Sequence, residues 1–457
     1  MDIEGFARRG FGRGMPEKDI VEKLAESILD IKFDGNPADK KRARLLASAV
    51  VDEVKMTLGG RDAFADTLLS FPKSGVSMGE FGVGSRGVGD FIVHRKIGKL
   101  ASLGSAAEVG PDAQDDAGVV KTASGDFLVV AVDGTHSRLS EYPFVAGFHV
   151  ARAAIRDVMV NGAWPAALLD DLHLSDDGDI GALFDFVSGV SVVSELTEVP
   201  IVAGSTLRTG GDMVIGQRMV SCVGCVGVLK SRREITQRKN VRAGDTVLMT
   251  EGAGGGTIAT TAIYSGNFDV VKETLNLNFI KAANALLDAG LAKKIDAMLD
   301  VTNGGIRGDA NEVCESAKCG LVFYEEKLMR LVNPNILNLL KKLDIDPLGV
   351  SIDALMLFVR PEHTEEIMAV VSKSGVRIAV VGEVTKGCEA FIVDGGGRKK
   401  RLAPLFRESG YTKIKKLVGE KTPADFEKMN AAVEGAYEES LKKRKRVLEY
   451  LKETMVP

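Results

Sequence analysis

Two adjacent carboxylates, Asp115 and Asp116, stand directly before a short apolar segment in the stretch PDAQDDAGVV. Like charges side by side repel each other, and a buried carboxylate is costly unless a cation or a hydrogen-bond donor compensates it. In proteins, Mg²⁺ is held by one or two carboxylates together with waters and substrate phosphates. The pair therefore indicates either an acidic, solvated turn or a site where a divalent cation meets a phosphate.

Further acidic residues recur where ligands of α/β proteins gather, at the carboxyl ends of strands. Asp133 lies in VAVDGTH, Asp157 in AIRDVMVNGAWP and Asp300 in LDVTNGG. Taken singly, such residues are more often turn formers or helix caps than metal ligands. Their repetition favours a shared site, because converging carboxylates with Mg²⁺ and a triphosphate can polarise a phosphoryl group for transfer.

Two glycine-rich loops are candidates for anion binding. GVGSRG, from Gly82 to Gly87, matches G-x-G-x-x-G, but no convincing strand precedes it, which disfavours a Rossmann dinucleotide site. A loop that folds over phosphates, with Arg86 supplying positive charge, and a flexible linker both remain open. The loop EGAGGGT, Glu251–Thr257, would seat an anion at a helix N-terminus or allow close helix–sheet packing, the interpretation we favour.

The elements that must position these residues follow from hydrophobic periodicity. Apolar residues at helical spacing predict helices over 17–31, 39–58, 147–163, 255–264, 279–290, 364–375 and 431–454. Apolar runs bounded by turn residues predict strands over 127–134, 200–206, 213–230, 245–252, 354–363 and 377–387, and the stretch 298–316 indicates a strand, a turn and a helix in succession. Strands thus alternate with helices between two helical ends, which predicts an α/β (α+β) fold.

Length, charge and composition exclude several classes of protein. With 457 residues the chain is too long for one ordinary core, so two or three domains are expected. A net charge of −4 argues against broad attraction to nucleic acid or to an anionic membrane. No apolar run is long enough to cross a bilayer, and the N-terminus lacks the apolar core of a secretory signal. These features predict a cytoplasmic protein.

Cysteine and histidine patterns do not point to a metal or nucleophile site. Cys222 and Cys225 form a C-x-x-C, but the flanking run resembles a buried strand, and no second pair completes a tetrahedral zinc site. We therefore expect buried thiols rather than a redox centre. Among the five histidines, which show no metal spacing, His136 alone lies inside a candidate site.

In their order, the motifs DDAGVV, DVMVNGAWP and DVTNGG resemble the aminoimidazole ribonucleotide synthetase-related (PurM-like) superfamily. This superfamily includes selenophosphate synthetase, thiamine-monophosphate kinase, the hydrogenase maturation factor that dehydrates a carbamoyl group, and formylglycinamidine ribonucleotide amidotransferase. The resemblance covers roughly residues 89–387. It implies a PurM-like two-domain fold that dimerises through its N-terminal halves and holds ATP and Mg²⁺ under a glycine-rich segment.

The resemblance also assigns regions and residues. It implies a helical N-terminal extension (1–80), an N-terminal ATP-binding domain (81–232), a C-terminal α/β domain (233–400) and a charged helical tail (401–457). The implied metal ligands are Asp115, Asp116, Asp133 and Asp300. The implied catalytic residues are Asp133, Asp157 and Arg86. The implied nucleotide-binding residues are Gly84, Gly87, Asn161, Gly162, Gly204, Thr206, Gly254 and Gly255.

The implied activity is ATP- and Mg²⁺-dependent phosphorylation of a small amide, acyl-oxygen or chalcogen acceptor, by a kinase or a cyclo-ligase. Selenophosphate synthetases carry a reactive cysteine or selenocysteine and a lysine in the glycine-rich loop, where this chain offers Ser85 and Arg86. Because of such departures, the alternative is a non-catalytic nucleotide-binding maturation or scaffold protein. The helical ends are candidate contacts for a protein partner, and a dinucleotide-dependent oxidoreductase would rest on GVGSRG alone.

Overall fold

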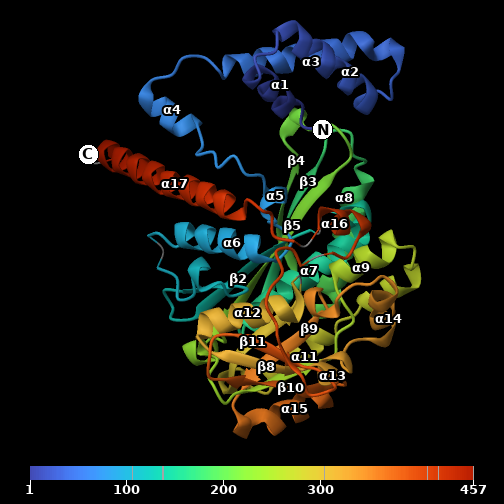
Figure 1. Cartoon of the computed structure of the whole chain (residues 1–457), viewed down its shortest axis with the longest axis vertical. Coiled ribbons are helices and arrows are strands. Elements are labelled where there is room, and N and C mark those ends of the chain that lie inside the picture. Colours follow the sequence, from blue (N-terminus) through green and yellow to red (C-terminus); the bar gives the residue numbers. More distant parts are fainter. Residues whose placement is uncertain (105, 136–137, 303, 409, 420, 456–457) are drawn as a thin grey trace.

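A computed structural model describes residues 1–457 of the chain except positions 105, 136–137, 303, 409, 420 and 456–457. Two β-sheets with their helices form the body of the molecule (Figure 1). The first helices of the chain form a separate bundle beside this body, and the last, long helix projects from the body near the C-terminus. The mixed helix-and-sheet fold and the helices at both ends, which the sequence predicts, are confirmed. No helix among the described residues is both long and apolar enough to cross a membrane.

The first sheet has five strands in the order β1-β2-β5-β3-β4. Its strands are β1 (Gly118–Lys121), β2 (Phe127–Gly134), β3 (Trp164–Leu174), β4 (Ile201–Arg208) and β5 (Met219–Leu229). Only β3 and β4 pair in parallel, and the other neighbours are antiparallel. Along β2, Phe127, Val129 and Ala131 are buried while Val130 and Val132 are exposed, so one face meets a helical layer and the other does not.

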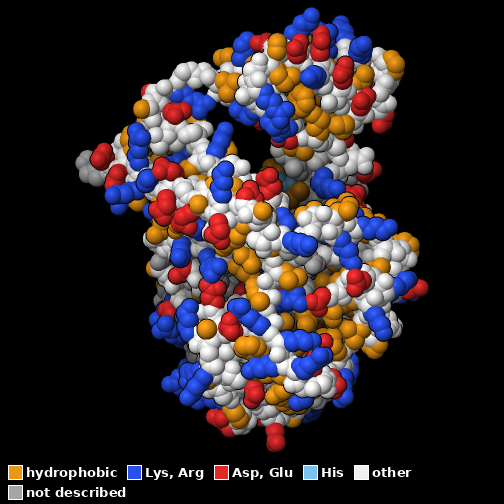
Figure 2. All heavy atoms as spheres, in the orientation of Figure 1, with side chains coloured by type: hydrophobic (Ala, Val, Ile, Leu, Met, Phe, Trp, Pro, Cys, Tyr) orange, Lys and Arg blue, Asp and Glu red, His pale blue; other side chains and the backbone are white. Residues whose placement is uncertain are grey.

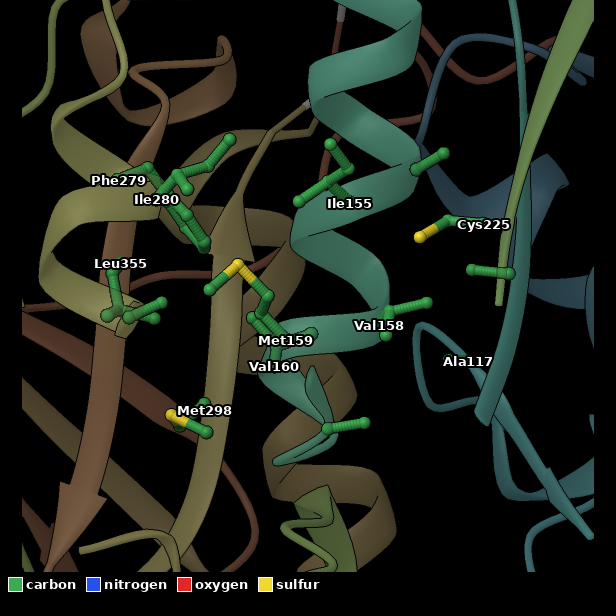
Figure 3. Packing of buried hydrophobic residues seen from close by; sticks show 14 of the residues in the cluster. Ala117, Ile155, Val158, Met159, Val160, Cys225, Phe279, Ile280, Met298 and Leu355 are labelled. Carbon is green, nitrogen blue, oxygen red and sulfur yellow. The ribbon is translucent and has the colours of Figure 1, made fainter. Parts of the chain in front are cut away.

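The helical layer of this sheet consists of α7 (Pro143–Val160) and α8 (Gly181–Thr197), which pack against each other. Nearly every residue of α7 is buried, the pattern of a helix enclosed on all sides. Figure 3 shows why: Met159 and Val160 point toward Ile280 and Met298 of the C-terminal half, while Val158 points toward Cys225 of β5. Helix α7 therefore joins the two halves through one core.

The second sheet has seven strands in the order β12-β11-β8-β10-β6-β9-β7. They are β6 (Thr246–Thr250), β7 (Ile295–Val301), β8 (Gly320–Tyr324), β9 (Ala354–Val359), β10 (Ile378–Thr385), β11 (Ala390–Val393) and β12 (Lys399–Arg401). All residues of β9 are buried, and alternate side chains enter different cores: Leu355 and Leu357 pack in the core that contains α7, and Met356 and Phe358 in the other. Such a strand is buried on both faces, as its continuous apolar run indicates.

Helices cover both faces of the second sheet. They are α9 (Gly256–Tyr264), α10 (Val271–Thr274), α11 (Asn278–Asp288), α12 (Gly305–Ala317), α13 (Glu325–Met329), α14 (Pro334–Lys342) and α15 (Thr364–Lys373), whereas the residues of the short helix α16 (Lys413–Val418) are exposed or half-buried, and it lies outside these layers. Two of them begin directly after a strand and a glycine-rich turn: α9 after β6, and α12 after β7. This arrangement brings helix starts and strand ends to the same edge of the sheet.

The N-terminal bundle has its own core. Helices α1 (Ile3–Gly12), α2 (Glu17–Lys32) and α3 (Lys40–Met56) bury a shared set of apolar side chains, and α2 and α3 match the predicted amphipathic helices. The bundle is tied to the loops of the first sheet, where the N-terminal amine donates to the carbonyl of Ile215 at 2.5 Å and Lys32 pairs with Asp176 and Asp177. The bundle therefore rests on the end of the first sheet.

The C-terminal helix α17 (Phe426–Met455) lies against two helices from the beginning of the chain, α4 (Ala63–Leu69) and α6 (Val88–Ala101). The ring of Phe64 lies 4.1 Å from that of Tyr450, and Lys96 of α6 pairs with Glu434. Between α4 and α6, the short helix α5 (Met78–Phe81) ends directly before the glycine-rich loop Gly82–Gly87, and α6 begins directly after it. Figure 2 shows positive and negative side chains intermingled over this face.

Candidate functional site

A cavity of about 550 Å³ opens where the two halves meet, at the edge that collects strand ends and helix starts. Its wall includes residues of α6, β2, α7, β7 and α12, and the beginning of α9. Seven residues singled out from the sequence line it: Arg86, Asp115, Asp116, Asp133, Asp157, Gly255 and Asp300. The carboxylates that the sequence places far apart are thus brought to one cavity.

Each carboxylate is placed by a different element. Asp133 ends β2, Asp157 lies in the last turn of α7, and Asp300 lies at the end of β7. Asp115 and Asp116 precede β1, and their loop is fastened by Asn161, whose Oδ1 accepts the N–H of Ala117 at 3.1 Å. The predicted nucleotide ligand Asn161 is itself buried, and it donates to the carbonyl of Thr236, so here it positions the acidic loop.

Burial and mutual repulsion raise the pKa values of the inner carboxyl groups. Burial first, and then the charges of Asp300, Asp133 and Asp116, raise the pKa of Asp157 well above its ordinary value. Burial is also the largest cause that raises the pKa of Asp300 to about 7, against the opposing charge of Arg156. Protons or a cation are therefore needed to hold these groups together.

Arg238, which the sequence did not single out, binds the adjacent acidic pair. Its guanidinium lies 2.8 Å from Asp116 and 3.4 Å from Glu312, and its backbone N–H donates to Asp115 at 2.9 Å. Burial alone would lower the pKa of Arg238, but the three carboxylates raise it well above its ordinary value. Its only sequence signal is its place in the basic connector KSRREITQRKNVRAGD.

Two arginines of α7 bind the C-terminal half beneath the cavity. Arg156 lies 3.3 Å from Asp300 and also pairs with Asp353, and Arg152 lies 2.7 Å from Asp353. Arg152 also donates to the carbonyl of Gly254 at 3.4 Å. These contacts fix the start of α9 and the end of β7 relative to α7.

The glycine-rich loop 251–257 contributes residues to the cavity wall and also packs closely against a neighbouring backbone segment. Helix α9 starts at Gly256, and Gly255, Gly256 and Thr257 line the cavity. A Cβ at Gly252 would collide with the carbonyl of Ile352, so close backbone packing also requires glycine in this loop. Gly254 stands just outside the lining.

Other predicted ligands stand apart from the cavity wall. Gly84 and Gly87 lie in the loop that carries Arg86, but they do not line the cavity. Gly162, at a positive φ of 87°, forms the turn between α7 and β3. Gly204 and Thr206 lie on the exposed edge strand β4.

The remaining sequence candidates are one histidine and the two cysteines of the C-x-x-C. His136 lies outside the described residues. Cys222 and Cys225 lie on β5; Cys225 is buried, as expected, whereas Cys222 is only half-buried. Burial, and then the charge of Asp157, raise the pKa of Cys225 to about 12, which disfavours a reactive thiolate.

The charges of the lining set out what the cavity can bind. Six carboxylates and four guanidinium groups line it, an excess of two negative charges. Among the described residues, no three carboxylate, thiol or imidazole groups are grouped so that they would hold a metal ion. This combination suits Mg²⁺, which takes few protein carboxylates and completes its shell with waters and phosphate oxygens.

Sequence comparisons find relatives along the whole chain and along its central part. An uncharacterized protein of Methanocaldococcus jannaschii is 51% identical over 457 residues. The matched part makes up 99% of this chain and 99% of that protein. A putative hydrogenase expression/formation protein of the same organism is 24% identical over 295 residues, which are 63% of this chain and 84% of that protein.

Solved structures share the fold. A HypE–HypF complex matches with a TM-score of 0.55 and 20% identity, over 67% of this chain and 99% of that one. HypE in complex with ATP matches with a TM-score of 0.50 and 18% identity, over 62% and 87% of the two chains. AaThiL complexed with AMPPCP and TMP matches with a TM-score of 0.51 and 20% identity, over 69% and 94%. At these identities the likeness concerns the fold alone.

Models of protein families match two consecutive parts of the chain. Residues 114–229 match the N-terminal domain of AIR synthase related protein, and residues 242–395 match its C-terminal domain. The two matches span the acidic pair, β2, α7 and β7, the parts that build the cavity. The chain thus belongs to the AIR synthase related proteins, the PurM-like superfamily.

Proposed function

We propose that this protein catalyses ATP- and Mg²⁺-dependent phosphoryl transfer to a small acceptor with an amide, acyl-oxygen or chalcogen nucleophile. The observation that carries the proposal is the convergence of Asp116, Asp133, Asp157 and Asp300 on one cavity, with mutual repulsion that raises the pKa of Asp157. Carboxylates held together at this cost suit a site that receives a cation with its ligand.

The residues have distinct roles in this proposal. One or two carboxylates among Asp116, Asp133 and Asp300 would hold Mg²⁺ together with phosphate oxygens and waters, whereas Asp115 is held back by the hydrogen bonds that it accepts from Arg238 and Gln237. When bound, Mg²⁺ would neutralise the phosphate charge that develops during transfer. Asp157, whose pKa is raised well above its ordinary value by burial and then by the neighbouring carboxylates, exchanges protons with the acceptor.

Arg86 supplies positive charge at the cavity wall in the proposed reaction. Burial would lower the pKa of Arg86, but Glu312, Asp116, Asp309 and Asp300 raise it, so the guanidinium stays charged. A charged arginine directed into a cavity suits a phosphoryl group. The solved structures of HypE with ATP and of AaThiL with AMPPCP support a nucleotide as the donor.

Turnover tests the proposal directly. The purified protein is incubated with ATP, Mg²⁺ and separate pools of amide, carboxylate and selenide or sulfide acceptors, and ³¹P NMR follows ADP and new phosphorus signals. We expect ADP to form with one acceptor class, to require Mg²⁺, and to be lost in Asp300→Asn. A control outside the cavity lining, Asp126→Asn, should behave as the parent protein does. Nucleotide binding without ADP formation in every pool would contradict catalysis.

The second candidate is a nucleotide-binding maturation or scaffold protein without catalysis. It is favoured by the arginines that already neutralise the carboxylates, Arg238 at Asp116 and Arg156 at Asp300. The helical ends offer surface for a protein partner, and the likeness to a HypE–HypF complex supports this type of assembly. Binding of nucleotide without turnover, together with a stable partner that requires α17, would favour it over the first proposal.

We also propose that the chain divides into the regions 1–80, 81–232, 233–400 and 401–457. Two copies then pair through the face of the first sheet that the described helices leave uncovered, which belongs to the region 81–232. Val130 and Val202 on this face are 47% and 61% exposed. Light scattering should give a dimer mass for the parent protein and a monomer mass for the double variant Val130→Glu/Val202→Glu. A dimer that persists in this variant would exclude the sheet face as the interface.

A further inference from the structure

The loop of Gly82–Gly87 directs its N–H groups at a carboxylate of the chain itself. Asp90, in the first turn of α6, accepts the N–H of Gly84 at 2.7 Å and that of Ser85 at 2.8 Å, and it also accepts the N–H of Arg86. Its side chain is only 1% exposed. Consecutive N–H groups that surround an anion form the arrangement used elsewhere for phosphate, and here Asp90 occupies it.

The same hydrogen bonds hold Arg86 in a conformation that non-glycine residues rarely adopt. Arg86 has a φ of 52°, which costs about 1 kcal/mol or more unless the surroundings impose it. Its side chain leaves the loop toward the cavity and lies 3.7 Å from Glu312. Backbone strain at a cavity-facing arginine, imposed by a buried carboxylate, indicates that Asp90 controls where Arg86 points.

A segment of the C-terminal half closes over the outside of the loop. We call residues 402–408 the strap. The N–H of Val88 donates to the carbonyl of Leu405 at 3.2 Å, and the N–H of Glu408 donates to the carbonyl of Ser85 at 3.0 Å. A Cβ at Gly87 would collide with the carbonyl of Phe406, so only glycine allows this approach.

The strap is in turn anchored on α12. Glu408 lies 2.8 Å from Arg307 of α12 and accepts the N–H of Leu405 at 2.7 Å. Helix α12 also carries Glu312, the partner of Arg86 across the cavity. The glycine-rich loop is therefore fixed from inside by Asp90 and from outside by the strap.

We propose that Asp90 is a positioning residue, which keeps the loop closed on its own carboxylate so that the Arg86 guanidinium, and not the loop N–H groups, meets the phosphates of a nucleoside triphosphate. This inference rests on the proposed nucleotide site. It differs from a lid that wraps phosphates, because in that case the phosphates would have to displace Asp90 from the N–H groups of Gly84, Ser85 and Arg86.

A double-mutant cycle separates these two models. The affinity for a non-hydrolysable ATP analogue with Mg²⁺ is measured by calorimetry for the parent, Arg86→Met, Asp90→Asn and the double variant, with Asp126→Asn as a control outside the cavity lining. We expect about a tenfold or greater loss in Arg86→Met, since hydrogen bonds to charged groups are strong. Asp90→Asn should lose about fivefold, and the double variant no more than Arg86→Met, because Asp90 acts through Arg86.

The opposite results overturn the proposal. If the loop N–H groups bind phosphate, Asp90→Asn tightens binding, since it removes a competing anion. If Asp90 only stabilises the fold, its loss weakens binding by the same factor with or without Arg86. Amide hydrogen exchange gives a readout without nucleotide: Gly84, Ser85 and Arg86 should exchange faster in Asp90→Asn, and unchanged protection would contradict the role. Absence of nucleotide binding in the parent would instead overturn the proposed function, and the role of Asp90 with it.

Discussion

At Arg238, one side chain gives two neighbouring carboxylates the counter-charge that the sequence indicated for a cation. Its guanidinium reaches Asp116 and Glu312, and its backbone N–H reaches Asp115. The side chain is 3% exposed, so this compensation occurs in a desolvated setting where an unpaired charge is costly. The acidic pair is therefore held in place before any ligand binds, and a divalent cation would share it with the arginine.

Arg238→Met should reveal this cost. Methionine fills much of the same volume but removes the guanidinium from Asp116 and Glu312, while the backbone N–H of residue 238 still binds Asp115; the loss should destabilise the fold by about 3–5 kcal/mol in EDTA. Mg²⁺ should restore part of the loss, because a ligand of the folded state stabilises it. Urea unfolding with EDTA and with Mg²⁺ measures both effects, and Arg232→Met, at a 76% exposed arginine, is the control. Equal effects at the two arginines would contradict this account.

Asp245, before β6, gives a prediction about pH. Burial, and then its neighbour Asp296, raise the pKa of Asp245 to about 6, while the N–H of Arg242 opposes the shift. The folded state therefore retains a proton that the unfolded state loses near pH 4, and stability falls as pH rises from about 4 to beyond 6. Asp245→Asn should abolish this loss, so that the variant is more stable than the parent at pH 8 by about 1–3 kcal/mol and not at pH 4.

Asp394 serves as a control, because its pKa is shifted in the opposite direction from that of Asp245. The N–H of Arg398 and its neighbouring cations lower the pKa of Asp394 to about 2, so its contribution exists above pH 4 and disappears as the pH falls toward 2. Asp394→Asn should therefore lower stability at pH 8 and not raise it. Chemical unfolding between pH 3 and 8 measures both variants. A parallel shift of the two pH profiles would show that neither carboxyl group acts as described.

At the scale of elements, α7 connects fold and site. Its apolar residues pack on both halves (Figure 3), while Asp157 lines the cavity and Arg152 and Arg156 bind Asp353. A helix enclosed in this way has little freedom to shift. The site is thus built on a rigid element shared by the two sheets. The loop before β1 is fastened to Asn161, the residue directly after α7, and the loop before α6 is fastened to the strap.

The start of α6 offers a matched test on two glycines. Gly87→Ala introduces a Cβ that collides with the carbonyl of Phe406, whereas Gly435, within α17, has no neighbouring atom within 4 Å. Gly435→Ala should raise stability by about 0.5–1 kcal/mol through helix propensity. Gly87→Ala should lower stability and expose the strap to proteolysis near residues 402–408. Equal behaviour of the two variants would show that the strap does not depend on Gly87.

At the scale of the whole molecule, the predicted parts are those encoded by local pattern. The buried strand β9, the amphipathic helices α2 and α3, and the strand–turn–helix at Asp300 were visible because periodicity and glycine mark them. Helix α6 was not predicted, because its start depends on tertiary contacts from Asp90 and the strap rather than on a local pattern in its sequence.

The same distinction holds for the site. The acidic residues were found because superfamily motifs mark them, and the cavity brings five of them together. Arg238 was missed because it lies 122 residues from Asp116, and no local pattern connects the two. Arg156 and Glu312 were missed for the same reason, because their partners lie far away in the sequence and are brought close only when the two halves pack together. Gly204 and Thr206 were assigned by resemblance, and they lie on the edge strand β4, outside the cavity wall.

One measurement tests the central claim most directly: calorimetric titration of the full chain with a non-hydrolysable ATP analogue, with Mg²⁺ and with EDTA, for the parent and for Asp300→Asn. The account predicts binding that requires Mg²⁺ in the parent and is weakened at least tenfold in Asp300→Asn, because a carboxylate ligand of the cation is lost. Binding of equal strength in EDTA, or an unchanged affinity in Asp300→Asn, would contradict a cation site formed by these carboxylates.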